Sequence, residues 1–487
     1  MSALSPFVLL FAPWALAGAA ALLVRRSPRW VGWSGVAAAA LAVAASLQLA
    51  AGLLAGRPAA AAMGDTFGAD ALSAILCVCI SLVSLLAAAF GPGLAGPETD
   101  AGATRRFRVG LSAFAPTMLL AVTTQNVAIM WVAIEATTIA SALVIPLART
   151  KASVEASWKY MLICSVGIAL AFTGTVLAYF DFISTAGARQ GALTFAVLQQ
   201  AAPVLHRELM QLAFAFILVG YGTKAGLAPM HTWLPDAYSE APPPIAAMMS
   251  GVLVAVAMYA IARWKAVVDV AATPAFTNAL LLGAGLLSVA IGAFSLVVQR
   301  HYKRMLAYSS VEHMGLVSLG LALGPAGTFA ALLHLVNHAF AKSMAFLAAG
   351  RVSRRYATTE IAGVSGLLGA MPWSGGLFAA AVLALIGLPP FGLFVSEFLL
   401  VRAAVVSGHF WIAAAVAVFI LTTFVSLLRH LNAMLYGPVP EGVETGEPRS
   451  WGLVALAGCL AVLLALGLVL PWPVSALLDR SVAVLTP

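Results

Sequence analysis

The sequence has 487 residues, of which 62% are hydrophobic and only 9% are charged, and its mean hydropathy is +0.99. A water-soluble fold of this length needs a larger polar exterior, so the composition excludes a soluble protein and predicts a polytopic membrane protein. The formal net charge of +8 does not predict a nucleic-acid partner, because the Lys and Arg residues lie in short clusters between apolar runs and not on one face of a domain.

Apolar runs long enough to span a bilayer recur about fourteen times along the chain. They fall at roughly 6–24, 33–55, 69–92, 108–124, 126–148, 157–180, 207–226, 242–263, 276–298, 305–323, 326–350, 372–401, 409–435 and 451–471. Hydrophobicity does not alternate within the runs, which favours helices over a β-barrel and predicts an all-α integral membrane protein with about 14 transmembrane helices. The first run has no basic n-region and no small-residue cleavage site, so we expect a span and not a signal peptide.

The basic residues predict the orientation of these helices. Seventeen of the 26 Lys and Arg residues follow odd-numbered runs, and seven follow even-numbered runs or lie at the C-terminus. The seven include Arg263 and Lys265, which we expect in the loop after the eighth run. The positive-inside rule then places the odd-to-even loops in the cytoplasm and both termini on the periplasmic side of a bacterial inner membrane.

The cysteines give no sign of a redox or metal centre. Cys77, Cys79, Cys164 and Cys459 lack the spacing of a zinc site, an iron–sulfur site or a CxxC motif. We interpret Cys77 and Cys79 as small apolar residues within a span. The chain is therefore expected to hold no metal or cofactor and to have no catalytic site of its own.

Several ionisable residues lie where the pattern predicts the interior of a membrane. A charge at mid-bilayer costs about 2.5–3.5 kcal/mol on insertion scales, so each of these residues calls for a functional explanation. They are Glu135, Lys224, Lys342 and Glu397, to which Glu312 and His313 in the run AYSSVEHMG are added.

His334, His338 and Lys342 are spaced four residues apart in the eleventh run. This spacing predicts a stripe of titratable groups on one helix face, which favours a proton path through the rings and water. Two alternatives are hydrogen bonding to neighbouring helices and a metal site formed by the two histidines. The HExxH pattern of metalloproteases is missing and no cysteine partner is evident, so the metal hypothesis is disfavoured.

Two of the expected helices are interrupted by proline. Pro229 follows Lys224 in the seventh helix, and Pro389-Pro390 precedes Glu397 in the twelfth. Proline frees backbone carbonyls, which is tolerated at membrane depth only beside protein or a water-filled cavity. A pair of broken helices at corresponding positions indicates an inverted repeat with a site near the midplane.

This symmetry predicts the organisation of the chain. We expect helices 4–8, residues 105–265, and helices 9–13, residues 266–436, to form two five-helix repeats of opposite orientation. Residues 1–104 would form helices 1–3, and residues 437–487 a C-terminal loop with helix 14.

Four segments carry a family resemblance: KAGLAPMHTWLPDAYSEAPPPIAAMMSG, YKRMLAYSSVEHMG, HLVNHAFAKSMAFLAAG and GLPPFGLFVSEF. They are similar to the antiporter-like proton-channel subunits of respiratory complex I, a family that includes Mrp-type sodium/proton antiporters and group 4 NiFe hydrogenases. The segment PMHTWLPDAYSEAPPP and the acidic end of VSEF most resemble the F component of hydrogenase-4 and formate hydrogenlyase-type complexes.

The resemblance implies roles for the buried charges. It makes Glu135 the fifth-helix glutamate, Lys224 its seventh-helix partner and Glu397 the terminal acid of the second half-channel. It makes His334, His338 and Lys342 central relay groups; further candidates are Glu312, His313, His231 and Asp236. The eighth helix departs from the pattern, because Met249 and Ala255 occupy the places where relatives often have lysine or histidine, so Ser250 or water would have to connect the half-channels.

The expected function is proton translocation, coupled to redox chemistry in NiFe hydrogenase-like or dehydrogenase-like peripheral subunits and beside other antiporter-like membrane subunits. Two alternatives stay open: an Mrp-type sodium/proton antiporter subunit, and a structural membrane subunit that conducts nothing. Glu397 in place of lysine favours the first hypothesis modestly over the antiporter.

Overall fold

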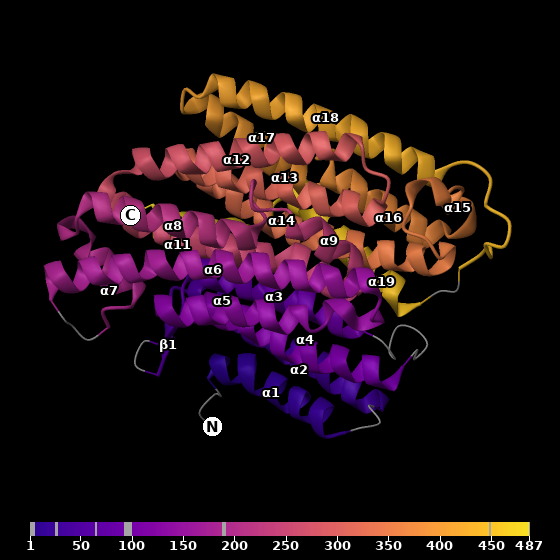
Figure 1. Cartoon of the computed structure of the whole chain (residues 1–487), viewed down its shortest axis with the longest axis horizontal. Helices are drawn as coiled ribbons and strands as arrows, with labels where there is room; N and C mark the ends of the chain where they lie inside the picture. The colour runs from indigo at the N-terminus through magenta and orange to yellow at the C-terminus, as the bar shows by residue number, and fades with distance from the viewer. Residues whose placement is uncertain are drawn as a thin grey trace.

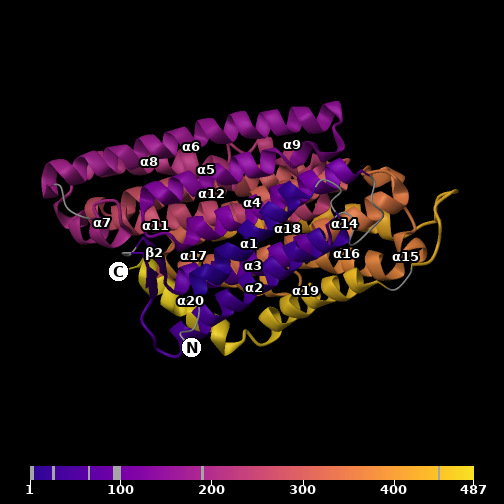
Figure 2. The same cartoon turned by 90° about the horizontal axis from the view of Figure 1, so that it is seen from below.

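The computed structural model describes residues 5–24, 28–63, 66–91, 100–187, 191–447 and 450–486. Long helices lie side by side along the long axis of the molecule, with the N-terminal helices at one edge and α17 and α18 at the other (Figure 1). The two ends of the chain lie in the same half of the molecule in both views (Figures 1 and 2).

The elements follow the predicted runs closely. The first half contains α1 (Pro6–Leu23), α2 (Arg29–Leu54), the antiparallel pair β1 (Ala60–Ala62) and β2 (Phe67–Ala69), α3 (Ala71–Ala89), α4 (Ala101–Thr123), α5 (Val127–Ala142), η1 (Ile145–Ala148), α6 (Lys151–Ala186), α7 (Phe195–Ala201), η2 (Ala202–Val204), α8 (Arg207–Ala225), α9 (Trp233–Glu240), α10 (Pro243–Met248), the π-turn η3 (Met249–Leu253) and α11 (Val254–Ala272). The second half contains α12 (Pro274–Val297), α13 (Tyr302–Ala322), α14 (Gly324–Tyr356), η4 (Ile361–Gly363), α15 (Leu367–Ala370), α16 (Pro372–Leu385), α17 (Gly392–Val406), α18 (Phe410–Leu435), α19 (Trp451–Leu468) and α20 (Trp472–Leu485).

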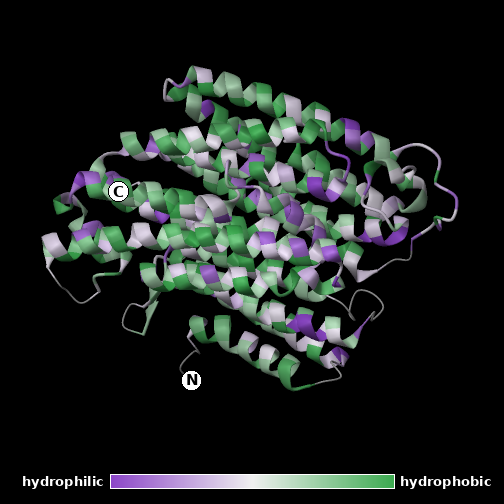
Figure 3. Ribbon diagram, in the orientation of Figure 1, coloured by the Kyte–Doolittle hydropathy of each residue, from purple (hydrophilic) through white to green (hydrophobic). Residues whose placement is uncertain are grey.

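Within the described residues, nine helices are long and apolar enough to span a membrane. The protein is therefore an all-helical, multi-pass membrane protein, as predicted. The long helices α4, α8, α13 and α14 are not among the nine, and they carry the Arg, Lys, Glu and His residues that reduce their hydropathy. Hydrophilic residues accordingly interrupt the apolar ribbons inside the bundle and gather at the end that carries α15 (Figure 3).

Both predicted helix interruptions are present. Helix α8 ends at Ala225, Gly226 adopts a left-handed φ of 77°, and α9 begins only at Trp233. Helix α16 ends at Leu385, and α17 begins at Gly392. The peptide bonds Ala228–Pro229 and Pro389–Pro390 are cis.

Protein groups satisfy the backbone that the first interruption frees. The indole Nε1 of Trp233 donates to the Thr223 carbonyl at 2.8 Å, and the Ala228 amide donates to Ser288 Oγ at 2.9 Å. These bonds come from α9 and α12, so the interruption depends on its neighbours for stability, as a buried polar backbone requires.

The expected position of Arg263 and Lys265 is wrong. Both lie within α11, and Arg263 is buried, where it pairs with Asp70 at the start of α3. The hydrophobic pattern predicts that the span ends at these cations. Hydropathy along one segment does not include Asp70, which is distant in sequence and neutralises Arg263. Helix α20 is a further difference, since it follows the last predicted run and packs against α3.

Candidate proton-relay site

The first cluster of buried charges joins α5, α6 and α8. Lys224 is fully buried, and its Nζ donates to Thr138 Oγ1 at 2.7 Å. Thr138 Oγ1 in turn donates to Glu135 Oε2 at 3.2 Å, and Ser165 Oγ donates to Glu135 Oε1 at 2.7 Å. Among the described residues no direct ion pair joins Glu135 to Lys224; one threonine hydroxyl lies between them instead.

The cluster continues away from Glu135. Lys224 Nζ also donates to the Tyr160 hydroxyl at 2.6 Å and lies 4.7 Å from the centre of that ring. The Tyr160 hydroxyl is 2.8 Å from Ser141 Oγ, which donates to the Thr137 carbonyl. Because Ser141 has only one hydrogen to donate, Tyr160 is the donor to Ser141. A carboxylate, four hydroxyls and an ammonium group therefore form one hydrogen-bonded chain.

The second cluster joins α13, α14 and α17. His313 Nδ1 is 2.9 Å from His334 Nε2, and His334 Nδ1 is 2.9 Å from Ser396 Oγ. Ser396 Oγ donates its hydrogen to the Leu393 carbonyl, so it accepts from His334 Nδ1. Neutral His334 then accepts at Nε2 from His313 Nδ1, which leaves His313 Nε2 as a free acceptor. This network assigns one tautomer to each ring and gives the chain a direction.

Buried polar atoms without a protein partner surround this second cluster. They are His313 Nε2, both ring nitrogens of His338, Glu312 Oε2 and Asn337 Oδ1, as judged against the part of the chain that is described. Such atoms are costly in a membrane interior unless water reaches them, because each is a strong hydrogen-bonding group. The second cluster therefore has the chemistry of a hydrated site.

The predicted stripe on α14 faces α13. His334 contacts His313, and the His338 ring centre lies 5.2 Å from that of His313. Lys342 Nζ donates to the Leu306 carbonyl at 2.7 Å and to Ser309 Oγ at 2.5 Å. The three groups share a face, but the bonds that the structure gives them run to α13 and α17 and not from one group to the next.

The two remaining acids of this cluster contact different elements. Glu312 Oε1 accepts from Thr423 Oγ1 of α18 at 2.7 Å. The Glu397 carboxylate lies against the backbone of Gly387, where any Cβ would overlap Glu397 Oε2. Gly387 has a φ of 72°, so the second helix interruption places its backbone directly beside the acid.

The gap between the clusters lies at the π-turn η3. Ser250 Oγ in η3 is 2.9 Å from Ser310 Oγ of α13, one residue from the Ser309 that contacts Lys342. The π-turn leaves the Met249 carbonyl to accept from the Tyr238 hydroxyl at 3.0 Å. Between Tyr160 and this serine pair lie Trp233 and Tyr238, and the described residues provide no continuous side-chain chain across that stretch.

The two other predicted candidates lie near the far end of the first cluster. Asp236 in α9 pairs with Arg304 at 2.7 Å and with Lys159 at 3.4 Å, which ties α9 to α13 and α6. His231 is half-buried in the segment before α9, and its Nδ1 has no partner among the described residues. Neither residue is hydrogen-bonded to Lys224.

Sequence reasoning missed the hydroxyl groups of both clusters. Thr138 follows Glu135 by three residues, so helical spacing could have indicated it. Tyr160 and Ser396 lie on other helices from their partners, and only the tertiary fold brings them into contact.

His313, His334 and Glu397 offer ligand atoms within 4.8 Å of one another, and such a set suits a divalent metal in kind. The contact between His313 Nδ1 and His334 Nε2, however, is a hydrogen bond of 2.9 Å. A metal bound by these two atoms would replace the proton that the rings share.

Comparison with known proteins identifies the class. The family described as NADH:quinone oxidoreductase/Mrp antiporter, TM matches residues 124–424. The chain therefore belongs to this family, which confirms the resemblance in its motifs.

Individual relatives are consistent with this family. The chain is 38% identical over 385 residues to a hydrogenase-4 component F homolog of Methylacidiphilum infernorum, a match covering 78% of this chain and 80% of that protein. It is 33% identical to NADH-quinone oxidoreductase subunit N of Desulforudis audaxviator, covering 96% and 95%. A chain of respiratory complex I from Thermus thermophilus has the same fold, with a TM-score of 0.77, 26% identity and coverage of 95% and 99%.

Proposed function

We propose that this protein is a proton-translocating subunit of a complex I-like or group 4 hydrogenase-type membrane complex. It moves protons through its buried Glu, Lys and His residues, and the energy comes from redox chemistry in partner subunits. Its partners are other membrane-arm subunits and a NiFe hydrogenase-like or dehydrogenase-like peripheral part. The family and the relatives named above support this class of function.

The observation that carries the proposal is the link from Glu135 through Thr138 to Lys224. A nearby carboxylate favours the charged form of a buried lysine, so a change in the distance between them changes how tightly the lysine holds its proton. Thr138 transmits this effect because its hydroxyl bonds to both groups. A small movement of α5 against α8 would thus load or release a proton at Lys224.

The second cluster would pass the proton onward. A proton that arrives at His313 Nε2 allows His313 to give its Nδ1 proton to His334 Nε2. His334 can then release its own Nδ1 proton toward Ser396 and the neighbouring Glu397. Glu397 is the terminal acid that delivers protons to the outer face.

Protons cross the neutral eighth helix by hydroxyl groups and water. The Ser250–Ser310 pair at the π-turn η3 occupies this position, and Ser309 beside it bonds to Lys342. Two hydroxyls in place of an ionisable group would pass protons on, and neither hydroxyl would hold a proton.

The proposed architecture has fourteen membrane crossings and two inverted repeats, residues 105–265 and 266–436. The interruptions between α8 and α9 and between α16 and α17 occupy corresponding places in these two segments, which supports the symmetry. The two chain ends on one side of the molecule agree with an even number of crossings, and the positive-inside rule makes that side periplasmic.

The decisive experiment reconstitutes the complex in proteoliposomes and measures proton uptake on turnover. We expect Glu135→Gln, Lys224→Ala and Glu397→Gln each to abolish proton uptake while the complex still assembles. Intact uptake in all three variants would instead identify a structural subunit that conducts nothing.

A sodium/proton antiporter subunit is the alternative, because the family description names Mrp antiporters beside NADH:quinone oxidoreductases. Radiolabelled sodium uptake, driven by an imposed proton gradient without redox substrate, separates the two functions. Uptake that depends on Lys224 would support the antiporter; uptake of protons only, and only during redox turnover, supports the coupled subunit.

A further inference from the structure

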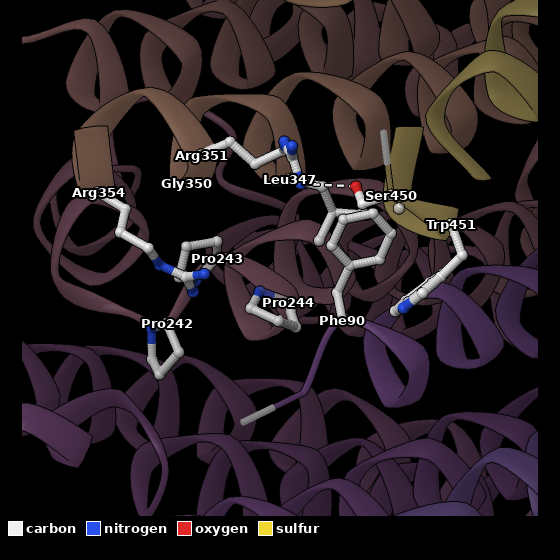
Figure 4. Close-up of a pocket in the computed structure, with 11 residues that line it drawn as sticks. Phe90, Pro242, Pro243, Pro244, Leu347, Gly350, Arg351, Arg354, Ser450 and Trp451 are labelled. Atoms are coloured by element: carbon white, nitrogen blue, oxygen red, sulfur yellow. Dashed lines mark hydrogen bonds between the residues drawn. The ribbon is translucent and has the colours of Figure 1, made fainter. Parts of the chain in front are cut away.

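A pocket of about 120 Å³ lies outside the proposed proton path, and Figure 4 shows the residues that line it. Its walls come from the ends of four helices. Phe90 follows α3, Pro243 begins α10, Arg351 lies near the end of α14, and Trp451 begins α19.

These helix ends place the pocket at the level of the membrane surface. Three of the candidate spans start or end at it, namely Ala71–Ala89, Pro243–Ala272 and Trp451–Leu468. The rings of Trp451 and Phe90 meet edge to face at 5.1 Å, and Trp451 is 46% exposed. Tryptophan at the end of a span is typical of the headgroup region of a bilayer.

The two arginines of the pocket differ in their pairing. Arg351 donates to Glu447, Ser374 and Ser450, so its charge is neutralised by an acid. Arg354 is exposed, and the described part of the chain gives it no hydrogen bond or ion pair. The figure shows its guanidinium group beside Pro243 (Figure 4). No acidic residue is among the described residues that line the pocket.

We propose that this pocket binds the phosphate group of an anionic phospholipid. Arg354 supplies a positive charge that makes no ion pair in the described part of the chain, although Glu444 and Glu447 line the adjacent pocket with it. A guanidinium group bonds phosphate oxygens in pairs. Trp451, Phe90 and Leu347 supply an apolar wall along which the glycerol backbone and the start of the acyl chains lie. The lipid joins α3 and α10 to α14 and α19, four helices that are distant in sequence.

Lipid titration of the purified, delipidated full-length protein tests the proposal, with the thermal unfolding midpoint as the readout. Phosphatidylglycerol should stabilise the wild type, and the zwitterionic phosphatidylcholine should not. In Arg354→Gln the apparent affinity for phosphatidylglycerol should fall about tenfold, as expected for the loss of one charge-assisted bond. Because Arg354 is exposed and unpaired, this variant should fold as the wild type does.

Arg355→Gln is the matched control. Arg355 is the next residue on α14, but it bonds to Glu444 and does not line the pocket. This variant should keep the wild-type affinity. Equal losses in both variants, or equal stabilisation by phosphatidylglycerol in all three proteins, would show a diffuse charge effect and overturn the site.

Inorganic phosphate separates a lipid site from a simple anion site. Millimolar phosphate that stabilises the protein as well as the lipid does would overturn the lipid assignment. Native mass spectrometry gives an independent readout: one anionic phospholipid should be retained by the wild type and by Arg355→Gln, and lost from Arg354→Gln.

Discussion

At the scale of single residues, a threonine hydroxyl carries the contact between the two charges of the first cluster. Glu135 and Lys224 were predicted as partners, and the structure brings them together only through Thr138. The family motif implied the pairing of the charges as a prediction. The motif did not predict the bridging hydroxyl, although the three-residue spacing of Thr138 from Glu135 on one helix could have indicated it.

Thr138→Val should reduce proton uptake in proteoliposomes about tenfold, the effect of about 1.4 kcal/mol on one step. The variant removes the hydroxyl but keeps the shape of the side chain. Thr138→Ser should restore most of the rate. Thr173→Val, at an exposed threonine of α6 that bonds only to its own helix, is the control and should be silent. A normal rate in Thr138→Val would remove the bridge from the mechanism.

Gly387→Ala should abolish proton uptake and lower the free energy of unfolding by at least about 1 kcal/mol. The new Cβ would overlap the Glu397 carboxylate, and the φ of 72° strains any other residue. Gly376→Ala is the matched control, since its Cβ would meet nothing within 4 Å. Thermal unfolding and proton uptake are measured for both variants. Equal stability and equal uptake in the two would contradict the contact between Gly387 and the Glu397 carboxylate.

At the scale of elements, the interruption after α8 is stabilised by the indole of Trp233. Trp233→Phe should destabilise the protein by about 0.5–1.5 kcal/mol, the net contribution of one hydrogen bond, because the Thr223 carbonyl loses the indole and keeps only the Gly226 amide as a donor. Trp264→Phe is the control, because it makes the same substitution at another buried tryptophan. The Nε1 of Trp264 has no hydrogen-bond partner among the described residues. Chemical or thermal unfolding in detergent should show the larger loss for Trp233.

The loop that follows α18 is held by Glu447, which bonds to Arg351 and Ser374. Burial alone would raise the pKa of the Glu447 carboxyl, but the hydrogen bonds from Ser374 and Arg351 outweigh it and hold the pKa below its ordinary value of 4.5. An acid with a lowered pKa stabilises the folded loop above its ordinary pKa. That stabilisation is lost as the pH falls through the lower, folded value.

A spin label at Glu441→Cys, with the four buried native cysteines left in place, should therefore stay immobile at neutral pH and become mobile only once the pH falls below the ordinary glutamate pKa of 4.5. With Glu447→Gln added, the label should be mobile at neutral pH as well. Glu444→Gln is the control, because Glu444 is 88% exposed and its loss leaves the Glu447 contacts intact. A label that stays mobile at all pH values in the parent would contradict the anchoring role.

At the scale of the whole molecule, the ion pair of half-buried Asp70 and buried Arg263 connects the N-terminal helices to α11. Asp70→Asn should destabilise the protein by about 3 kcal/mol, since it leaves a buried guanidinium without its counter-charge. The double variant Asp70→Asn, Arg263→Met should recover much of this loss, because both charges are then gone. Thermal unfolding of the single and double variants measures the difference; additive losses would show that the pair is not coupled.

The sequence alone determined that this is an all-helical membrane protein, where most of its spans lie and where two helices break, and it predicted which buried residues carry protons. Hydropathy, helical spacing and proline act locally, so they can be read along one segment. The tertiary structure decided the rest: the hydroxyls that join the charges, the tautomers of the histidine pair and the burial of Arg263 beside Asp70. These depend on side chains that meet from helices distant in sequence, and no local pattern records such a contact.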